Sequence, residues 1–375
     1  MDKTKNSFGL FLITTLLYIG CCGEYISKYI DASDGLVLTH VIHRHGARTR
    51  AEETYPNDPY ANETFWPFGY EQLTNEGKLG EYRLGIDLRA RYGGFLGKIF
   101  YPEVVEARSS ESDRTKMSIS LSLAGLFPPK NVSIWNSELN WQPIPYSSYP
   151  AEEDRILGKP KKFCPLYKKL LKKYKKGAGA DIFKDDLKLY KYLSKETGMD
   201  VANPDDVYDI LKILAVEEEW GLKLPNWTDS VWKDKLQNAA AKRFIVRTGT
   251  KELKQLASGF FLEKIISDTK DKITGTLKPK GRKMFLYSAH EQNIGHILAG
   301  LGLFDNDIPN YGSHLLFEVR LKNGTYGIEI YYQNYKGNDQ PTLLVLPGCD
   351  SFCPVNKFAD LLQDVLPTNK TSCTA

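Results

Sequence analysis

The chain has 375 residues, of which 42% are apolar and 26% are charged, with a formal net charge of +4 at pH 7. These values exclude a mostly disordered chain and a small disulfide-stapled scaffold, and they predict one large domain with an insertion, or two domains. The near balance of charge excludes a general nucleic-acid-binding protein, so any electrostatic site must be local.

The first 23 residues differ from the rest of the chain. Lys3 and Lys5 precede an apolar run over residues 8–19, and small residues follow it. This pattern predicts a signal peptide over residues 1–23, because the run is too short to span a bilayer. A membrane anchor is the alternative, but no later segment is apolar for long enough. We therefore expect a secreted protein without a stable membrane anchor, with the lysosome as the other destination.

The first predicted strand, residues 35–42, is apolar on both alternating faces, as in a strand that is buried on both sides of a parallel sheet. Residues 73–92 follow as a predicted helix with Thr74 as its N-cap. The face expected to pack carries Leu79, Tyr82 and Ile86. A strand followed by a helix is the pattern of α/β folds.

The pattern recurs twice. Residues 103–110 are a predicted strand before a helix that opens near Asp113 and stops at Pro128. Residues 282–289 are a third strand, which runs into a helix over residues 290–303. In each unit, charged or histidine residues lie at the strand-to-helix junction. Ligands of open α/β sheets bind at that edge.

Residues 141–251 have a different composition, with lysine-rich helical sequence. We interpret this segment as a helical cap inserted into an α/β core that comprises residues 24–140 and 252–375. The lysine run over residues 159–176 could bind a polyanion, but solvated helix faces usually have this composition, and we interpret it so.

Late in the chain, residues 314–321 and 325–333 are strand-like and flank Asn323-Gly324. This dipeptide is the strongest short-range signal for a hairpin. We therefore expect an antiparallel addition to the sheet.

Secretion determines how the cysteines are interpreted, because thiols pair in an oxidising compartment. Four cysteines follow the signal peptide, at positions 164, 349, 353 and 373, and four cysteines allow three pairings. Cys349 and Cys353 are close enough to close a small loop, which would leave Cys164 to tie the middle of the chain to its tail. A zinc site is the alternative.

Five N-x-S/T sequences could carry glycans. They begin at Asn62, Asn131, Asn226, Asn323 and Asn369. Together with a signal peptide, they favour a eukaryotic secreted glycoprotein.

Positive charge is concentrated just past the first strand. His45 is flanked there by Arg44 and Arg48, and the sequence SDRT contributes Arg114 from the next junction. Three guanidinium groups around one imidazole predict a phosphate site. The cations should lower the pKa of His45 below its reference value of ~6.5, which leaves a ring nitrogen free for nucleophilic attack in mild acid.

The third junction places His290 and Glu291 at a helix N-terminus, which also favours an anion. We expect His290 to donate a hydrogen bond to phosphoryl oxygens. A bound phosphate should raise the pKa of Glu291, so that this carboxyl group stays protonated in acid and donates to the leaving alcohol. The residues predict phosphohistidine chemistry with an acid pH optimum.

The same residues carry a family resemblance. RHGARTR resembles the RHGxRxP signature of the histidine acid phosphatases, which form branch 2 of the histidine phosphatase superfamily. SDRT resembles their second arginine motif, and SAHEQN their His-Asp or His-Glu motif. The similarity runs from about Leu36 to Cys373 and includes LTNEGKLGEYRLG, LFPP, WQPIP and LPGCDSFCP. The chain looks closest to the insect venom, lysosomal and prostatic acid phosphatases.

The resemblance implies an α/β fold like that of phosphoglycerate mutase, with a mostly parallel sheet flanked by helices. It implies that His45 is the nucleophile and Glu291 the proton donor, with no metal and no other cofactor. The implied phosphate ligands are Arg44, Arg48, Arg114 and His290. The implied disulfides are Cys164–Cys373 and Cys349–Cys353.

Three positions depart from the family pattern. Arg50 stands where the signature has proline, so it should either alter the loop that aims Arg48 or add charge at the mouth of the site. Glu291 replaces the commoner aspartate and is one methylene longer, so the donor geometry and the accepted leaving groups should differ. Ala47 occupies a position where many relatives have an acid, with a smaller expected effect.

Three other functions remain open. His43 and His45 could present two ligands to a metal, although the flanking arginines would repel a cation. Further ligands would have to come from His40, His290, His296 and His314. We interpret His40, His43 and His296 as core or supporting residues instead. Secretion argues against a phosphotransferase of the mutase type. The presence of both His45 and Glu291 argues against a secreted binding protein without turnover.

The leaving group is not identified by any motif. The expected partner is a small-molecule phosphate monoester or a phosphoprotein, and not a nucleic acid. Members of the family often dimerise, so a homodimer is an alternative to a monomer.

Overall fold

The computed structural model of the chain describes residues 25–336, 340–371 and 373. The predicted signal peptide, residues 1–23, lies outside the described residues. Within the described ranges, the structure contains no helix that is long and apolar enough to cross a membrane.

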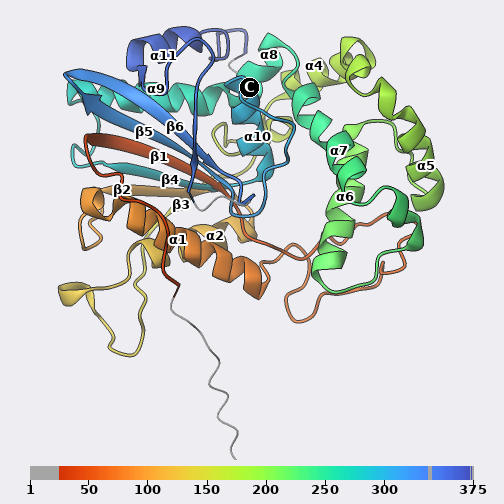
Figure 1. Cartoon of the computed structure of the whole chain (residues 1–375), viewed down its shortest axis with the longest axis horizontal. Helices are drawn as coiled ribbons and strands as arrows, with labels where there is room; N and C mark the ends of the chain where they lie inside the picture. Colours follow the sequence, from red (N-terminus) through yellow and green to blue (C-terminus); the bar gives the residue numbers. More distant parts are fainter. Residues whose placement is uncertain (1–24, 337–339, 372, 374–375) are drawn as a thin grey trace, which may run out of the picture.

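Eight strands of the described chain form one sheet at the centre of the fold (Figure 1). They are β1 (Leu36–Arg44), β2 (Val105–Ser109), β3 (Ser147–Ser148), β4 (Met284–Ala289), β5 (His314–Lys322), β6 (Thr325–Gln333), β7 (Thr342–Leu344) and β8 (Cys353–Pro354). Their order is β3-β2-β4-β1-β5-β6-β7, with β8 paired to β6. The strands from β3 to β1 are mutually parallel, whereas β5, β6, β7 and β8 pair antiparallel with their neighbours. The predicted α/β fold is confirmed, with an antiparallel extension on one side.

Helices cover both faces of the sheet (Figure 1). They are α1 (Asn75–Leu96) and α2 (Asp113–Leu126) on one face, and α9 (Phe260–Thr274), α10 (Glu291–Gly300) and α11 (Val355–Leu361) on the other. Strand β1 contributes to both apolar layers, because Val41 packs with the α1 and α2 side and Ile42 with the α9 and α10 side. Both side chains are fully buried, which explains why this strand has no polar face.

Helix α1 begins where the sequence predicts, because Oγ1 of Thr74 accepts a hydrogen bond from the backbone N–H of Gly77 at 3.1 Å. Its predicted packing face is wrong. Leu79 is exposed, whereas the apolar residues that are fully buried are Leu84, Leu88 and Tyr92. Close approach of α2 selects this face, since a Cβ atom at Gly85 would lie 2.2 Å from the carbonyl oxygen of Ser122.

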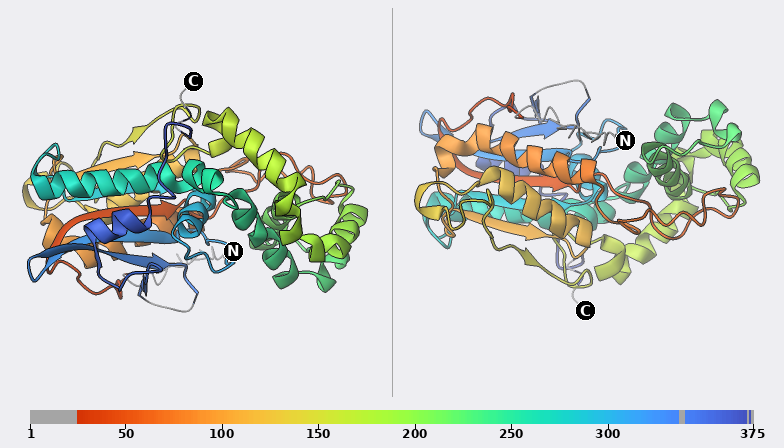
Figure 2. Two further views of the ribbon diagram at one scale, coloured as in Figure 1. Left: turned by 90° about the horizontal axis from the view of Figure 1, so that it is seen from above. Right: turned by 90° about the horizontal axis from the view of Figure 1, so that it is seen from below.

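A helical cap stands at one end of the sheet (Figure 2). Its helices are α3 (Pro160–Phe163), α4 (Pro165–Lys176), α5 (Leu187–Thr197), α6 (Pro204–Glu219) and α7 (Asp234–Arg247). Short helical segments complete this part of the chain: η2 (Ala178–Ile182), η3 (Lys184–Asp186), η4 (Asn226–Ser230), α8 (Lys251–Lys254) and the π-helical η5 (Gln255–Gly259). A further short helix, η1 (Asn131–Ser133), lies before β3. The cap has an apolar core of its own, which includes Tyr167, Leu193, Leu214, Ala240 and Phe244.

The cap is not built from one continuous segment. Tyr55, from the loop between β1 and α1, is buried in the cap core. From the same loop, Tyr60 donates its hydroxyl hydrogen to the carbonyl oxygen of Lys223 at 2.6 Å. Conversely, β3 lies inside residues 141–251 yet pairs with β2, so the sheet extends beyond the predicted start of the insertion.

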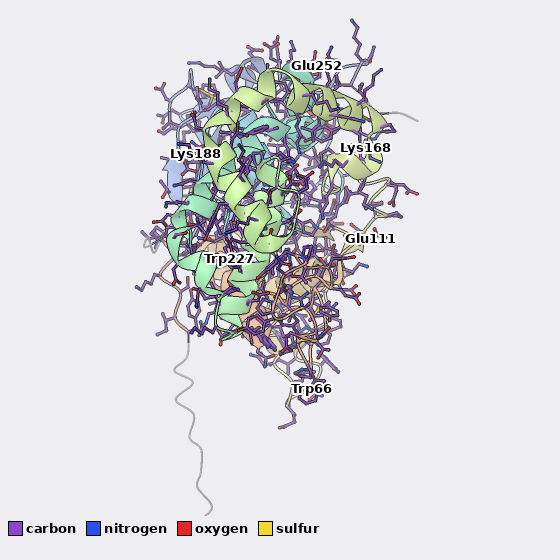
Figure 3. All side chains as sticks on the ribbon, turned by 90° about the vertical axis from the view of Figure 1, so that its right-hand side faces the viewer. Trp66, Glu111, Lys168, Lys188, Trp227 and Glu252 are labelled. Carbon is purple, nitrogen blue, oxygen red and sulfur yellow. A yellow bond between two sulfur atoms is a disulfide. The ribbon has the colours of Figure 1, made fainter. Side chains whose placement is uncertain are left out.

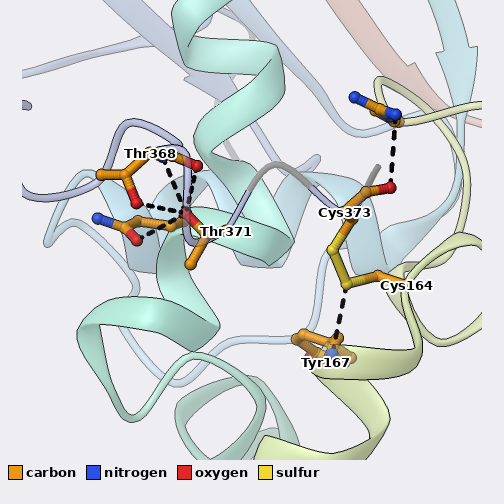
Figure 4. Close-up of a disulfide and its surroundings, with 7 residues drawn as sticks. Cys164, Tyr167, Thr368, Thr371 and Cys373 are labelled. Atoms are coloured by element: carbon orange, nitrogen blue, oxygen red, sulfur yellow. Dashed lines mark hydrogen bonds between the residues drawn. A yellow bond between two sulfur atoms is a disulfide. The ribbon is translucent and has the colours of Figure 1, made fainter. Parts of the chain in front are cut away.

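The hairpin and both disulfides are confirmed. Asn323 and Gly324 connect β5 to β6 with φ angles of 50° and 76°, the left-handed conformations that favour this dipeptide. Cys349 pairs with Cys353, and Cys164 pairs with Cys373. The second bridge ties the segment between α3 and α4 to the tail of the chain (Figure 4).

Candidate active site

Three strand ends meet beside the cap. In the sheet register, Arg44 at the end of β1 is opposite Ala289 at the end of β4. The backbone N–H of His45 donates to the carbonyl oxygen of Ala289 at 3.0 Å, and that of Ser110, which follows β2, donates to Ser288 at 3.1 Å. The parallel pairing of β1, β4 and β2 therefore brings the three predicted junctions together.

The predicted residues surround a cavity of about 450 Å³. Five of the six line it: His45, Arg48, Arg114, His290 and Glu291. Arg44 lines a neighbouring cavity of about 260 Å³, and Tyr208 and Lys212 border both. The structure thus brings five predicted residues into one site and places Arg44 at its flank.

The ring of His45 is held in one tautomer. Its Nδ1 atom lies 2.9 Å from the carbonyl oxygen of Gly46, and because a carbonyl oxygen only accepts, Nδ1 must carry the proton. Nε2 then has a free lone pair, which accepts a hydrogen bond from Nε of Arg114 at 3.3 Å. Burial, followed by the charges of Arg114 and Arg44, holds the pKa of His45 well below its usual value. The direction agrees with the prediction, but burial is a larger cause than the cations.

The arginines are held in place through their terminal nitrogens. Nη1 of Arg44 donates to the carbonyl oxygen of Pro309 at 2.7 Å, and its guanidinium lies 4.0 Å from the ring centre of Tyr311. Nη1 of Arg48 donates to the carbonyl oxygen of Thr49 at 2.7 Å. The Nε atoms of Arg44 and Arg48 are buried and have no hydrogen-bond partner in the described part of the chain. Buried unsatisfied donors are costly, which makes these atoms candidates for binding an anion.

His290 lies next to His45 at the start of α10, and the centres of the two rings are 5.4 Å apart. Its Nε2 atom is 3.0 Å from Oγ of Ser110. Burial and the charges of Arg114 and Lys159 lower the pKa of His290 well below its usual value. The lowered pKa favours the neutral ring, which can act as a hydrogen-bond donor or acceptor.

Glu291 faces cations from two directions. Its Oε1 atom lies 3.3 Å from Nη1 of Arg243, and its Oε2 atom lies 4.0 Å from Nε of Arg44. Burial acts to raise the pKa of Glu291, but Arg44 and Arg243 outweigh it and hold the pKa well below its usual value. The protein's own charges thus act against the rise that a bound phosphate is expected to produce.

The remaining histidines of the candidate metal set do not line the cavity that contains His45. Nδ1 of His43 lies 2.9 Å from Oε2 of Glu81, and both side chains are fully buried. His40 stacks on Phe285, with ring centres 4.7 Å apart. His296 and His314 are likewise buried away from the cavity.

Arg50 is buried in the loop between β1 and α1, where it binds the backbone of that loop. It is only 1% exposed and does not line the cavity that contains His45, but together with Arg48 it lines a neighbouring cavity of about 290 Å³. Its guanidinium donates to the backbone carbonyl oxygens of Ala51, Glu52, Tyr60 and Ala61. Arg50 therefore holds the loop that reaches the cap through these hydrogen bonds, and the dipoles of the backbone carbonyl groups stabilise its charge.

The lysine run over residues 159–176 is only partly the solvated surface that its composition predicts. Four of its lysines line the cavity: Lys159, Lys161, Lys162 and Lys168. Figure 3 views the molecule from the cap side, with Lys168 and Lys188 at opposite edges of the cap. The lysine-rich pattern alone does not distinguish these two positions.

Several site residues have no signal in the sequence. Cap residues Tyr208, Arg243 and Arg247 line the cavity, and Asp205 forms ion pairs with both arginines. Their helices, α6 and α7, carry ordinary amphipathic sequence. Only the tertiary packing of the cap on the core brings Arg243 to Glu291 and Arg247 to Gln292.

Comparison with known proteins agrees with this site. Residues 36–333 match the family model described as histidine phosphatase superfamily (branch 2). The chain is 38% identical to the venom acid phosphatase Acph-1 of Apis mellifera, over 92% of this chain and 89% of the relative. It is 34% identical to the prostatic acid phosphatase of Homo sapiens, over 90% of this chain and 88% of the relative.

Among solved structures, the apo form of Hafnia alvei phytase matches with a TM-score of 0.66. This match covers 92% of this chain and 99% of the phytase chain at 17% identity, which supports the fold alone. The chain therefore belongs to branch 2 of the histidine phosphatase superfamily, as the RHGARTR, SDRT and SAHEQN motifs predicted.

Proposed function

We propose that the chain is a secreted acid phosphatase that hydrolyses phosphate monoesters without a metal, through a phosphohistidine at His45. The observation that carries the proposal is the state of the His45 ring. Nδ1 is committed as a donor to Gly46, and Nε2 keeps its lone pair next to Arg114. The names of the relatives, which are acid phosphatases, support the same activity.

The proposed reaction is a double displacement. Nε2 of His45 forms a bond to phosphorus while the bond from phosphorus to the leaving oxygen breaks, and Glu291 gives that oxygen a proton. Water then attacks the phosphohistidine, its proton passes to Glu291, and the P–N bond breaks to release phosphate. Arg48, Arg114, His290 and Nε of Arg44 are the proposed donors to the phosphoryl oxygens.

An acid pH optimum follows from the charges around the site. Neutral His45 is needed for attack, and its lowered pKa keeps it neutral in mild acid. Protonated Glu291 is needed for the first step. The cations disfavour this form, and a phosphate dianion nearby restores it by like-charge repulsion. Activity should therefore fall as rising pH removes the proton from Glu291.

The cavity also suggests a class of substrate. Lys159, Lys162 and Lys168 line it and form no ion pair with the described residues, so their charge is available to a ligand. We propose that monoesters with a further negative charge on the alcohol part are preferred over neutral ones.

Other features support an extracellular location. Two disulfides join the four cysteines beyond the predicted signal peptide, and all five sequon asparagines are exposed. Both are typical of proteins that fold in an oxidising compartment. Relatives of this chain include venom, prostatic and lysosomal phosphatases.

A metal-dependent hydrolase is the second candidate, because ligand atoms of His45, His290 and Glu291 all lie within 4.8 Å of one another. The guanidinium of Arg114 next to Nε2 of His45 disfavours a cation there. The deciding experiment is hydrolysis of p-nitrophenyl phosphate from about pH 3 to 9 with excess EDTA. An acid optimum that survives EDTA and is lost in His45→Ala supports the phosphohistidine route, whereas loss of activity with EDTA supports the metal route.

A further inference from the structure

Arg243 connects the cap to the core at the candidate proton donor. It projects from α7, and its side chain is only 7% exposed. Nη1 lies 3.3 Å from Oε1 of Glu291, and Nε lies 3.3 Å from Oδ1 of Asp205. One guanidinium thus bridges a carboxylate of the core and a carboxylate of the cap.

The cap holds this guanidinium firmly. Its central carbon lies 3.7 Å from the ring centre of Tyr208, so the group stacks on an aromatic face of α6. Asp205, in the first turn of α6, is itself held by Arg247 at 2.8 Å and by Lys175. Arg243 is therefore positioned before any substrate binds.

The length of the acid matters for this contact. An aspartate at position 291 would be shorter by one C–C bond of about 1.5 Å, which would draw its carboxylate away from Arg243. The longer glutamate reaches Arg243 of the cap, so the replacement of aspartate by glutamate at this position allows this ion pair to form.

We propose that Arg243 is a positioning residue, which holds the Glu291 carboxylate toward the leaving group and so couples the cap to proton transfer. This inference rests on the proposed role of Glu291. Arg243 need not contact phosphate, and its effect is exerted through the carboxylate.

Several other groups face Glu291 and must be weighed against Arg243. They are Arg44 and His45 from the end of β1, Arg114 from α2, Lys159 before α3, Tyr208 from α6, His290 at the start of α10, and Tyr311. Of the cations among them, only Arg44 forms an ion pair with Glu291, at 4.0 Å. Arg243 makes the closer ion pair, so its removal should favour the protonated carboxyl group and shift activity toward higher pH.

The test compares two ester classes in Arg243→Gln. An alkyl ester such as glycerol 2-phosphate needs a well-placed proton donor, and its kcat should fall by about 10²-fold. The kcat for p-nitrophenyl phosphate should fall much less, because p-nitrophenolate leaves without a proton. The pH profile of the remaining activity should move to higher pH. Arg243→Lys should restore part of the alkyl-ester activity, since it keeps the charge but lacks the fork.

A matched control is Lys242→Gln, which removes the neighbouring cation of α7; Lys242 pairs with Asp186 and does not line the cavity. It should change neither the ratio of the two ester activities nor the pH profile. In Glu291→Asp, the contact between position 291 and Arg243 should already be weakened. Adding Arg243→Gln to this variant should therefore lower kcat for the alkyl ester only slightly further.

Equal losses on both ester classes with an unchanged pH profile would overturn the inference, because that pattern marks a purely structural role. Full additivity of Arg243→Gln with Glu291→Asp would do the same, and so would Arg243→Lys behaving like Arg243→Gln. If Arg243→Gln does not fold, Arg243→Lys and Glu291→Asp still test the coupling. A wild type without phosphatase turnover would instead refute the proposed function itself.

Discussion

Nε of Arg114 lies 3.3 Å from Nε2 of His45, so a cation already occupies the direction from which the proposed nucleophile would attack. A phosphoryl group that approaches His45 must meet this guanidinium first. Arg114 can then donate its hydrogen bond to a phosphoryl oxygen instead of the imidazole nitrogen. This exchange binds the phosphate and at the same time frees the lone pair of Nε2 for attack.

Replacing Arg114 by glutamine should lower kcat/KM for p-nitrophenyl phosphate by about 10²–10³-fold. Arg114 also lowers the pKa of His45, so in this variant the pKa should rise and the ring should become protonated at a higher pH. Protonated imidazole is not a nucleophile, and activity should therefore be lost first at the acid end of the pH profile. Lys116→Gln is the control, because Lys116 also lies on α2 but does not line the cavity. An unchanged acid limb in Arg114→Gln would argue against this pairing.

Two glycines of α1 offer a matched test of the loop that carries His45. A Cβ atom at Gly77 would lie 2.0 Å from the carbonyl oxygen of Ala47, whereas one at Gly80 would meet no atom within 4 Å. Gly77→Ala should destabilise the protein by about 1–3 kcal/mol through overpacking and should reduce kcat by displacing the loop. Gly80→Ala should stabilise it by about 0.5–1 kcal/mol. Urea unfolding measures both, and similar effects at the two positions would contradict the close approach of α1.

Arg50 should matter for stability and little for chemistry. Arg50→Met removes a donor from four backbone carbonyl oxygens, of which, among the described residues, only that of Tyr60 also accepts from another backbone N–H, that of Glu63; we expect the free energy of unfolding to fall by about 3 kcal/mol. The folded variant should keep a kcat close to that of the wild type, because Arg50 does not line the cavity that contains His45. A large loss of kcat at unchanged stability would contradict this prediction and would indicate that Arg50 acts at the mouth of the site.

The lysines of the cavity should select anionic substrates. In the double variant Lys162→Gln with Lys168→Gln, KM for 2-phosphoglycerate should rise several-fold more than KM for glycerol 2-phosphate, which lacks the carboxylate. Added salt should reduce the wild-type preference in the same direction, because exposed charges are screened. Lys188→Gln, at the opposite edge of the cap, is the control. Equal KM changes for the two substrates would contradict the proposed preference.

The sequence predicts the α/β core well because its signals are local. The buried strand before His45, the N-cap at Thr74 and the Asn323-Gly324 turn each require only a few neighbouring residues, and each lies where it was expected. The parallel order of the strands then brings His45, Arg114 and His290 to one edge.

The cap side of the site could not be predicted in this way. Arg243 and Asp205 are separated by 38 residues along the chain, and Arg243 meets Glu291 only through packing between the cap and the core. The buried face of α1 was missed for a related reason, because glycine contacts with α2 determine the rotation of the helix. The partners of Arg50 could not be predicted, because a buried arginine can be paired entirely by backbone carbonyl oxygens, which leave no pattern of side chains in the sequence.

The central claim is a covalent phosphate on His45, and a rapid-quench experiment tests it most directly. Wild-type protein is mixed with a radiolabelled phosphate monoester in mild acid, quenched in base within milliseconds and digested for mass spectrometry. We predict label on the peptide that contains His45, stable to base and released by acid, and no label in His45→Ala. Turnover without any labelled peptide, or label on another residue, would contradict the claim.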